Sequence, residues 1–188
     1  MAVKGLKRAY DFVAAVLLLL VTSPVLLLCM LAVRASSPGP VIFSQTRVGR
    51  DGVLFRCHKL RTMYHGTPSL PSHEAPANAV TAVGRTLRKF KLDELPQFWN
   101  VLIGQMSIVG PRPSPEKENQ MCPAWREARL SVRPGITGLW QVSRKRDRDD
   151  TDFQEWIYYD VQYIKKQSLW LDLKIMFKTL LVAMGGGQ

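Results

Sequence analysis

Two adjacent carboxylates, Asp93 and Glu94, stand in a basic stretch of the sequence. The cations that flank them are Arg85, Arg88, Lys89, Lys91 and Arg112. A carboxylate among cations is stabilised as the anion, and such an anion can attack phosphorus or hold a metal ion. The cations can bind a diphosphate, which must be neutralised before an anion approaches it. The alternative is a capping role, because acids at the start of a helix usually cap it.

The other residue types that often carry chemistry show no comparable pattern. The cysteines are far apart and contain no Cys-x-x-Cys pair, and the histidines have no compact ligand spacing: Cys29, Cys57, Cys122, His58, His65 and His73. A zinc site or a disulfide framework is therefore not indicated. The net charge is +11, from 26 basic and 15 acidic residues. This excess predicts anionic partners, which are nucleic acid, anionic lipid or phosphorylated substrates.

An apolar run without a charged side chain covers residues 12–33. Its length of about 22 residues is enough to cross a bilayer as a helix. A cleaved signal peptide is one alternative, since Lys4, Lys7 and Arg8 resemble its basic start. The run is too long for that, and no clear small-residue cleavage site follows it.

The middle of this run contains a helix break at Ser23 and Pro24. Pro24 cannot donate to the Leu20 carbonyl, so the helix should bend there. The hydroxyls of Thr22 and Ser23 can satisfy backbone groups that the bend frees. Basic residues lie on both sides of the run, and positive flanks favour the cytoplasm. A re-entrant hairpin satisfies both flanks, while a kinked spanning helix is the alternative that these residues leave open.

The rest of the chain alternates short elements with turns. Residues 41–43 predict a strand, and residues 48–55 predict a hairpin turning at Asp51-Gly52. Residues 64–79 predict a mobile surface loop, and residues 83–91 a basic helix. A further helix is expected from Leu92, with its apolar side running to Met106. Residues 133–138 predict a rigid turn. Residues 170–184 predict an apolar helix that either lies in the membrane interface or packs on the core.

Several segments together resemble the bacterial sugar transferase family, the monotopic phosphoglycosyl transferases. The matching segments are residues 45–49 (QTRVG), 59–63 (KLRTM), 92–102 (LDELPQFWNVL), 106–113 (MSIVGPRP), 132–142 (VRPGITGLWQV) and 168–175 (SLWLDLKI). The match spans nearly the whole chain in a specific order. Residues 143–152 depart from the family pattern, which leaves contacts from that segment in doubt.

The resemblance implies a chemistry and a set of site residues. Asp93 would be the nucleophile on a UDP-sugar, releasing UMP, and polyprenol phosphate would then attack the aspartyl adduct. Glu94 would complete the dyad as an acid, a base or a positioning group. Mg²⁺ would be the cofactor, held near Asp93. The residues expected to contact phosphate or nucleotide are Lys59, Arg88, Arg112, Arg133 and Gln141, with a structural role as the alternative for Arg133 and Gln141. The Ser23-Pro24 break matches the family's re-entrant helix, which favours the hairpin.

The expected fold is therefore α+β: a monotopic membrane protein with a re-entrant helix-break-helix, interfacial amphipathic helices and a small catalytic domain. Residues 1–35 would form the membrane hairpin. Residues 36–188 would form the catalytic domain, as a minimal form at the cytoplasmic face of the bacterial inner membrane. The expected partners are a UDP-sugar, polyprenol phosphate and the lipid bilayer, with a homodimer possible and no nucleic acid. A membrane-anchored nucleic-acid binder or a non-catalytic scaffold is the alternative, although interleaved basic and aromatic residues are lacking.

Overall fold

The computed structural model describes residues 2–67, 77–120, 123–143 and 153–184. The middle of the predicted loop 64–79 and the divergent segment 144–152 lie outside these residues. The helices are α1 (Ala2–Ser36), α2 (Ala82–Lys89), α3 (Gln97–Leu102), α4 (Glu116–Gln120), α5 (Pro123–Leu130), α6 (Leu139–Ser143), α7 (Phe153–Lys166) and α8 (Leu169–Met184). The strands are β1 (Ile42–Val48), β2 (Leu54–Leu60), β3 (Ser107–Val109) and β4 (Gly135–Thr137), and short 3-10 turns are η1 (Arg50–Gly52), η2 (Ala77–Ala79) and η3 (Leu92–Glu94).

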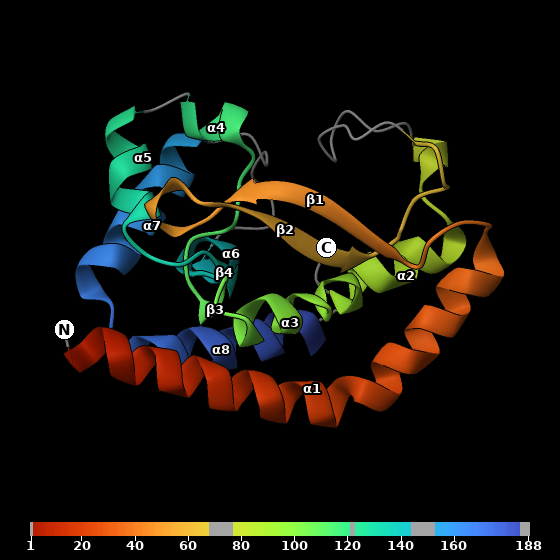
Figure 1. Cartoon of the computed structure of the whole chain (residues 1–188), viewed down its shortest axis with the longest axis horizontal. Coiled ribbons are helices and arrows are strands. Elements are labelled where there is room, and N and C mark those ends of the chain that lie inside the picture. The colour runs from red at the N-terminus through yellow and green to blue at the C-terminus, as the bar shows by residue number, and fades with distance from the viewer. Residues whose placement is uncertain (1, 68–76, 121–122, 144–152, 185–188) are drawn as a thin grey trace.

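Helix α1 contains Pro24 and changes direction between its two halves (Figure 1). The Ser23 Oγ donates to the Leu20 carbonyl at 2.8 Å, and the Thr22 Oγ1 donates to the Leu18 carbonyl at 2.6 Å. Leu20 is the residue whose carbonyl loses its helical partner to proline. The predicted bend is therefore present within one continuous helix, and the Ser23 hydroxyl bonds to the carbonyl that the proline frees. By length and composition, Gly5–Ser36 is apolar enough to cross a membrane.

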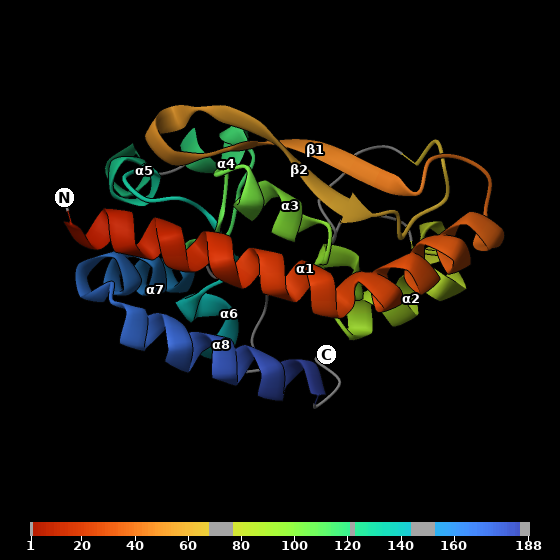
Figure 2. The same cartoon turned by 60° about the horizontal axis from the view of Figure 1, so that its bottom comes forward.

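Both halves of α1 pack against the rest of the chain. Ala15 in the first half is fully buried in the main core. Cys29 and Val33 in the second half form a separate cluster with Leu60 and Leu87. Helix α3 lies between α1 and the β1–β2 hairpin, as Figures 1 and 2 agree. Each half of α1 is thus held against the rest of the chain by its own cluster of buried side chains.

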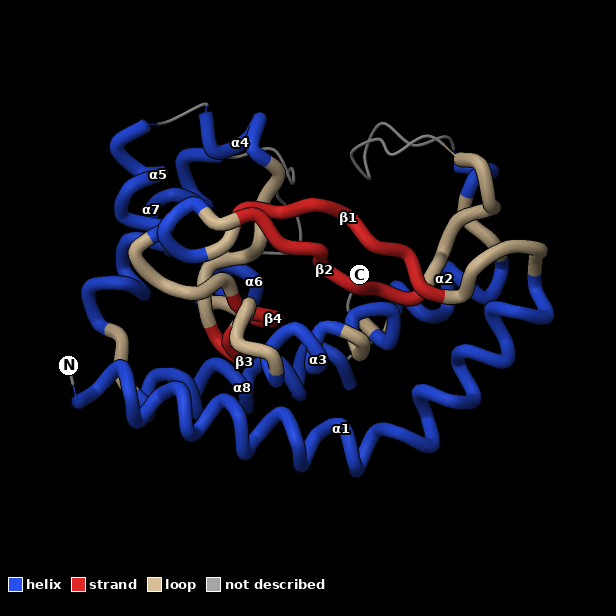
Figure 3. The backbone as a smooth tube through the Cα atoms, viewed as in Figure 1, coloured by secondary structure: helices blue, strands red, loops and turns tan. Residues whose placement is uncertain are grey.

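The strands form two small sheets, coloured red in Figure 3. Strands β1 and β2 pair antiparallel from Ile42↔Leu60 to Val48↔Leu54, around a turn in which Asp51 and Gly52 have positive φ. The predicted hairpin is therefore present, with longer strands than expected. Strands β3 and β4 pair in parallel, although the sequence around Gly135 predicts only a rigid turn.

The helix that begins near Leu92 is shorter than the sequence predicts. The 3-10 turn η3 gives way to α3, which ends at Leu102, and Gly104 then adopts φ +83°. Met106 is fully buried, but it lies beyond the helix end rather than on its apolar side. Met106 is part of the segment that leads into β3, and it is buried there. A prediction from helical spacing alone was wrong here because a buried loop residue has the same apolar character.

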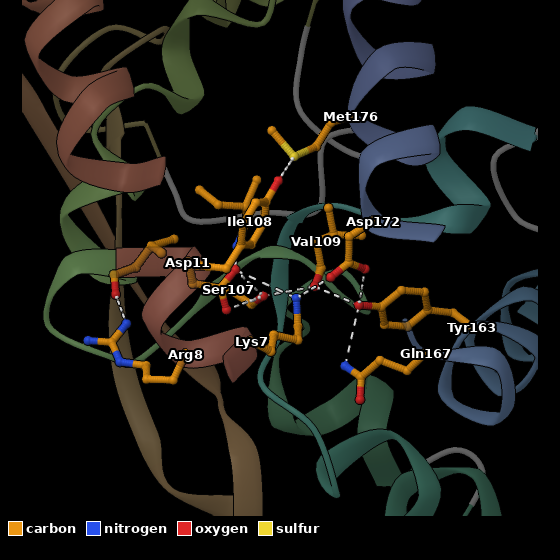
Figure 4. Close-up of polar contacts among 12 residues, drawn as sticks. Lys7, Arg8, Asp11, Ser107, Ile108, Val109, Tyr163, Gln167, Asp172 and Met176 are labelled. Carbon is orange, nitrogen blue, oxygen red and sulfur yellow. Dashed lines mark hydrogen bonds and ion pairs between the residues drawn. The ribbon is translucent and has the colours of Figure 1, made fainter. Parts of the chain in front are cut away.

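A buried polar network joins the first half of α1 to β3, α7 and α8 (Figure 4). The Lys7 Nζ contacts a carboxylate oxygen of Asp172 at 2.7 Å and one of Asp11 at 3.6 Å. Asp11 accepts hydrogen bonds from the Ser107 Oγ at 2.8 Å and from the Ile108 backbone at 3.1 Å. Buried charges need partners of this kind to offset their desolvation. The network therefore fixes α1 against the strand that leads to the candidate site.

Candidate active site

The two adjacent acids lie on η3, between the basic helix α2 and α3. Lys91 before them adopts a left-handed conformation at φ 57°, which ends α2 and starts a new direction. Asp93 is 7% exposed, whereas Glu94 is directed at the β1–β2 hairpin, where it meets Lys59. The two neighbours therefore occupy different environments.

Glu94 is held by two of the predicted phosphate-binding cations. The Lys59 Nζ lies 2.6 Å from its Oε1, and an Arg112 nitrogen lies 3.8 Å from the same oxygen. Burial alone would raise the pKa of Glu94, but Lys59 and Arg112 outweigh it and lower the pKa from 4.5 to about 2. The expected anion among cations is thus present at Glu94.

Asp93 differs in the balance of the same effects. Burial raises the pKa of Asp93 above its usual value, and the nearby positive charge of Lys59 opposes that shift only in part. The sequence predicts that the cations keep both acids charged; at Asp93 burial is the largest influence instead. A desolvated carboxylate is a poorly solvated anion once it is ionised, which favours its use as a nucleophile.

A pocket lies beside Glu94 and is built by residues from distant parts of the chain. Its lining consists of Arg47, Cys57, Lys59, Glu94, Gln97, Arg112, Pro113 and Ile136. Strands β1 and β2 supply the first three, η3 and α3 the next two, and the segments at β3 and β4 the rest. Three cations and one carboxylate in this lining make it an anion-binding site by charge.

The other predicted site residues are placed unequally. The Arg88 Nε donates to the Thr62 hydroxyl at 2.9 Å, and the charge of Arg88 acts on Asp93. The Arg133 Nε donates to the Gly104 carbonyl at 2.8 Å, and the Gln141 Nε2 donates to the Ile136 carbonyl at 3.4 Å. The residues that line the pocket do not include Asp93, Arg88, Arg133 or Gln141. The contacts of Arg133 and Gln141 with backbone carbonyls support the structural alternative for these two.

Five of the residues that line the pocket were not predicted as site residues: Arg47, Cys57, Gln97, Pro113 and Ile136. Two of them, Arg47 and Gln97, have side chains that can donate hydrogen bonds to a ligand. Arg47 lies within the QTRVG segment on β1, and Gln97 is 2% exposed at the start of α3. In the pairing of β1 with β2, Arg47 lies opposite Phe55 and shares a face with Cys57 and Lys59. This alternation is the signal that would have connected Arg47 with Lys59, once the hairpin register was known.

Asp93 and Glu94 are the carboxylates near the pocket that could hold Mg²⁺. Among the residues that the structure describes, no group of three or more histidine, cysteine, aspartate or glutamate side chains is suited to a metal ion. Mg²⁺ is often bound by one or two carboxylates together with substrate phosphates and water. Asp93 and Glu94 fit that lighter requirement, so the metal role of Asp93 remains a prediction.

Comparison with known proteins places these residues in a family. The family model for bacterial sugar transferases matches residues 2–186. The UDP-glucose:undecaprenyl-phosphate glucose-1-phosphate transferase of Escherichia coli (strain K12) is 46% identical over 182 residues, covering 93% of this chain and 39% of that protein. The undecaprenyl-phosphate galactose phosphotransferase of Salmonella typhimurium is 39% identical over 196 residues, covering 95% and 40%.

A shorter relative matches over most of its own length. The exopolysaccharide production protein ExoY of Sinorhizobium fredii is 38% identical over 191 residues, covering 93% of this chain and 83% of that protein. The chain spans about two fifths of the length of the Escherichia coli and Salmonella relatives. With a family match over nearly its whole length, the chain belongs to the bacterial sugar transferase family.

Proposed function

We propose that this protein is a phosphoglycosyl transferase that moves a sugar 1-phosphate from a UDP-sugar to polyprenol phosphate and releases UMP. The single observation that supports this most is the pair of adjacent acids at a cationic pocket. Asp93 is buried, and its neighbour Glu94 lines the pocket and is bound there by Lys59 and Arg112. The names of the relatives describe glucose or galactose phosphate transfer to undecaprenyl phosphate. The reaction would be a first membrane step in bacterial glycoconjugate synthesis, such as exopolysaccharide.

In the first step, an Asp93 carboxylate oxygen attacks the β-phosphorus of the UDP-sugar. A new oxygen–phosphorus bond forms, and the bond from the β-phosphorus to the bridging oxygen breaks. The electron pair stays on that oxygen, which leaves as part of the UMP phosphate and needs no proton. Lys59 and Arg112 offset the diphosphate charge as Asp93 approaches.

In the second step, a phosphate oxygen of polyprenol phosphate attacks the phosphorus of the aspartyl adduct. The bond to Asp93 breaks and its electron pair returns to the carboxylate, which leaves a polyprenol diphosphate sugar. Glu94 has a pKa of about 2 and carries no proton at neutral pH. Its role is therefore to position Lys59 and Arg112 rather than to act as an acid. Bound Mg²⁺ would supply further charge neutralisation near the phosphates, with Asp93 as its protein ligand.

The membrane arrangement is part of this proposal. Helix α1 is re-entrant, with both ends at the cytoplasmic face of the bacterial inner membrane. Two observations support this: the bend at Pro24, and the burial of Ala15 in the main core and of Val33 in the separate cluster with Leu60 and Leu87. Side chains on the outer side of α1 are exposed and apolar, which suits insertion into lipid: Val13, Leu17, Leu20, Val21, Leu27, Leu28 and Leu31.

The test is UMP release and adduct formation by the chain in nanodiscs with Mg²⁺. UDP-glucose and UDP-galactose are the first substrates to test, each with and without undecaprenyl phosphate. With the UDP-sugar alone, mass spectrometry should find one phosphosugar on the peptide that contains Asp93. An adduct on another residue would remove Asp93 as the nucleophile. Absence of UMP release with every UDP-sugar tested would remove the proposed activity.

A further inference from the structure

The pocket has a third cation, Arg47, besides Lys59 and Arg112. Arg47 is half-buried, and its Nη2 donates to the neutral amide oxygen of Gln45 at 2.5 Å. Burial lowers the pKa of Arg47, and the positive charge of Arg112 lowers it further. Glu118 and Glu94 offset part of this repulsion. Two guanidinium groups that line one pocket repel each other, and an anion bound between them would relieve this repulsion.

The charged groups of the site are spread along the hairpin. Lys59 lies 2.6 Å from Glu94, which directly follows Asp93 on η3. Glu94 also lies 3.8 Å from Arg112, and Arg112 lines the pocket together with Arg47. Along β1, Arg47 is four residues from Phe43, the residue that pairs with Lys59. Arg47 is therefore displaced along the hairpin from Lys59, whereas Asp93 is the neighbour of the carboxylate that Lys59 binds.

Phosphoryl transfer requires the leaving part of the diphosphate to extend away from the attacking group. The attacking and leaving oxygens lie roughly in line on opposite sides of the reacting phosphorus. With Asp93 attacking the β-phosphorus, the α-phosphate must lie on the side away from Asp93. Arg112 and Arg47, the latter displaced along the hairpin from Lys59, line the pocket that would receive this phosphate. Their guanidinium groups suit a phosphate that gains negative charge as it leaves.

We propose that Arg47, together with Arg112, binds the α-phosphate that leaves with the nucleoside, so that the diphosphate lies with its sugar end toward Asp93 and its nucleotide end toward β1. This inference rests on the proposed function. It assigns Arg47 to the leaving group, whereas Lys59 acts on the transferred phosphate. Arg47 should therefore serve the first step only, because the nucleotide has departed before polyprenol phosphate attacks.

The experiment compares R47Q with R56Q. Arg56 is an exposed residue on β2, opposite Thr46, and points to the other face of the same hairpin. R56Q therefore makes the same change of charge on the same element, outside the pocket. Three quantities are measured in nanodiscs: binding of radiolabelled UMP, the rate of adduct formation from a UDP-sugar, and the rate at which preformed adduct is transferred to undecaprenyl phosphate.

We expect R47Q to weaken UMP binding at least about tenfold, the loss typical of one hydrogen-bonded charged partner. Adduct formation should slow to a similar extent, whereas transfer from preformed adduct should stay within about twofold of the wild type, and R56Q should match the wild type throughout. R47K should recover part of the UMP binding, because it restores the charge without the planar fork. Equal UMP binding by R47Q and R56Q would overturn the assignment.

A purely structural role for Arg47 would give a different result. It would slow both half-reactions alike in R47Q, lower the melting temperature, and give no recovery of UMP binding in R47K; that pattern also overturns the assignment. Failure of the proposed function would give a different result again. The wild-type protein would then form no adduct from any UDP-sugar, but UMP binding by R47Q and R56Q could still be compared.

Discussion

Asp93 and Glu94 are neighbours in sequence whose carboxyl groups are shifted in opposite directions. Burial raises the pKa of Asp93, whereas Lys59 and Arg112 hold the pKa of Glu94 at about 2. Two carboxylates with separated pKa values can serve two roles in one site. Asp93 is suited to bond formation and Glu94 to holding cations in place, and the side-chain directions on η3 produce this division.

Replacing Asp93 by asparagine should separate activity from stability. We expect UMP release by D93N to fall by about a thousandfold or more, because the nucleophile is lost. The fold should be at least as stable as the wild type at neutral pH, since burying the ionised carboxylate is unfavourable and the amide avoids that cost. Activity and thermal unfolding in the same nanodiscs measure both. A large fall in melting temperature would contradict this account of Asp93.

Glu94 should make the stability depend on pH in a defined range. Its folded-state pKa of about 2 lies below the ordinary value of 4.5, so the carboxylate stabilises the fold above about pH 4.5. This contribution, on the order of 3 kcal/mol, is lost as pH falls through about 2. The difference in the free energy of unfolding between the wild type and E94Q should therefore shrink as pH falls from about 4.5 to about 2. The control is E116Q, which removes an exposed pair with Arg126 and should cost less than about 1 kcal/mol.

At the residue scale, the sequence predicted the centre of the site but not its full lining. The motif segments identified Asp93, Glu94, Lys59 and Arg112, which the fold brings together. Arg133 was assigned to the same chemistry because its residue type fits, yet its guanidinium donates to the Gly104 carbonyl. The direction of a long side chain depends on tertiary contacts that residue type does not encode.

At the element scale, the bend of α1 should depend on Pro24. P24A restores a backbone donor to the Leu20 carbonyl, which now accepts from Ser23. We expect a straighter helix and a larger population that spans the bilayer. Single cysteines at positions 4 and 36, in a background without the native cysteines, report this by labelling with an impermeant reagent. Wild-type protein should label on the cytoplasmic side at both positions, and P40A, outside the helix, should match it.

The segment that leads to Arg112 is fixed by a buried arginine from α5. The Arg129 guanidinium lies 4.5 Å from the Trp125 ring and 4.7 Å from the Trp156 ring. It donates to the Arg112 carbonyl and forms a 3.5 Å ion pair with Asp160. The aromatic faces and the carboxylate together replace the water that the buried cation loses.

Removing this guanidinium should be costly unless its partner is removed too. We expect R129M to lower the free energy of unfolding by about 3 to 5 kcal/mol, because Asp160 stays buried without its cation. The double variant R129M/D160L should be more stable than R129M alone. R126M, on the same helix with an exposed ion pair, should change stability by less than about 1 kcal/mol. Additive losses in the double variant would argue against a coupled pair.

Elements formed by local contacts were the ones that the sequence predicted well. The Asp51-Gly52 turn and the proline break each depend on residues within a few positions. The parallel pair of β3 with β4 joins segments that are well separated in sequence, and it depends on close backbone approach at Gly110 and Gly135, where a Cβ would clash. Such pairing has no local period, so residues 135–137 predicted only a turn.

At the scale of the whole molecule, two helices present apolar side chains outward along one edge. Figure 2 shows α1 and α8 side by side, and the Lys7–Asp172 ion pair joins them. Asp172 and Ile175 of α8 are buried, while its outward residues are exposed: Trp170, Leu173, Phe177, Leu180 and Leu181. Helix α4 lies on the opposite side of the molecule in both cartoons (Figures 1 and 2). We therefore predict that the side formed by α1 and α8 faces lipid and that α4 faces water.

The orientation of the whole molecule can be tested at Phe177, which is 63% exposed on α8. Transfer of an exposed aromatic ring from water to the membrane interface lowers its free energy, and the nearby Lys174 and Lys178 can reach anionic headgroups. An environment-sensitive fluorophore on a cysteine at position 177 should therefore emit at shorter wavelength in nanodiscs and be quenched by quenchers carried on lipid chains. The same fluorophore at position 117 on α4, where Lys117 is exposed, should emit as in water and resist that quenching. Equal quenching at both positions would mean that α8 does not lie at the lipid surface, and the catalytic layer would then be oriented by α1 alone.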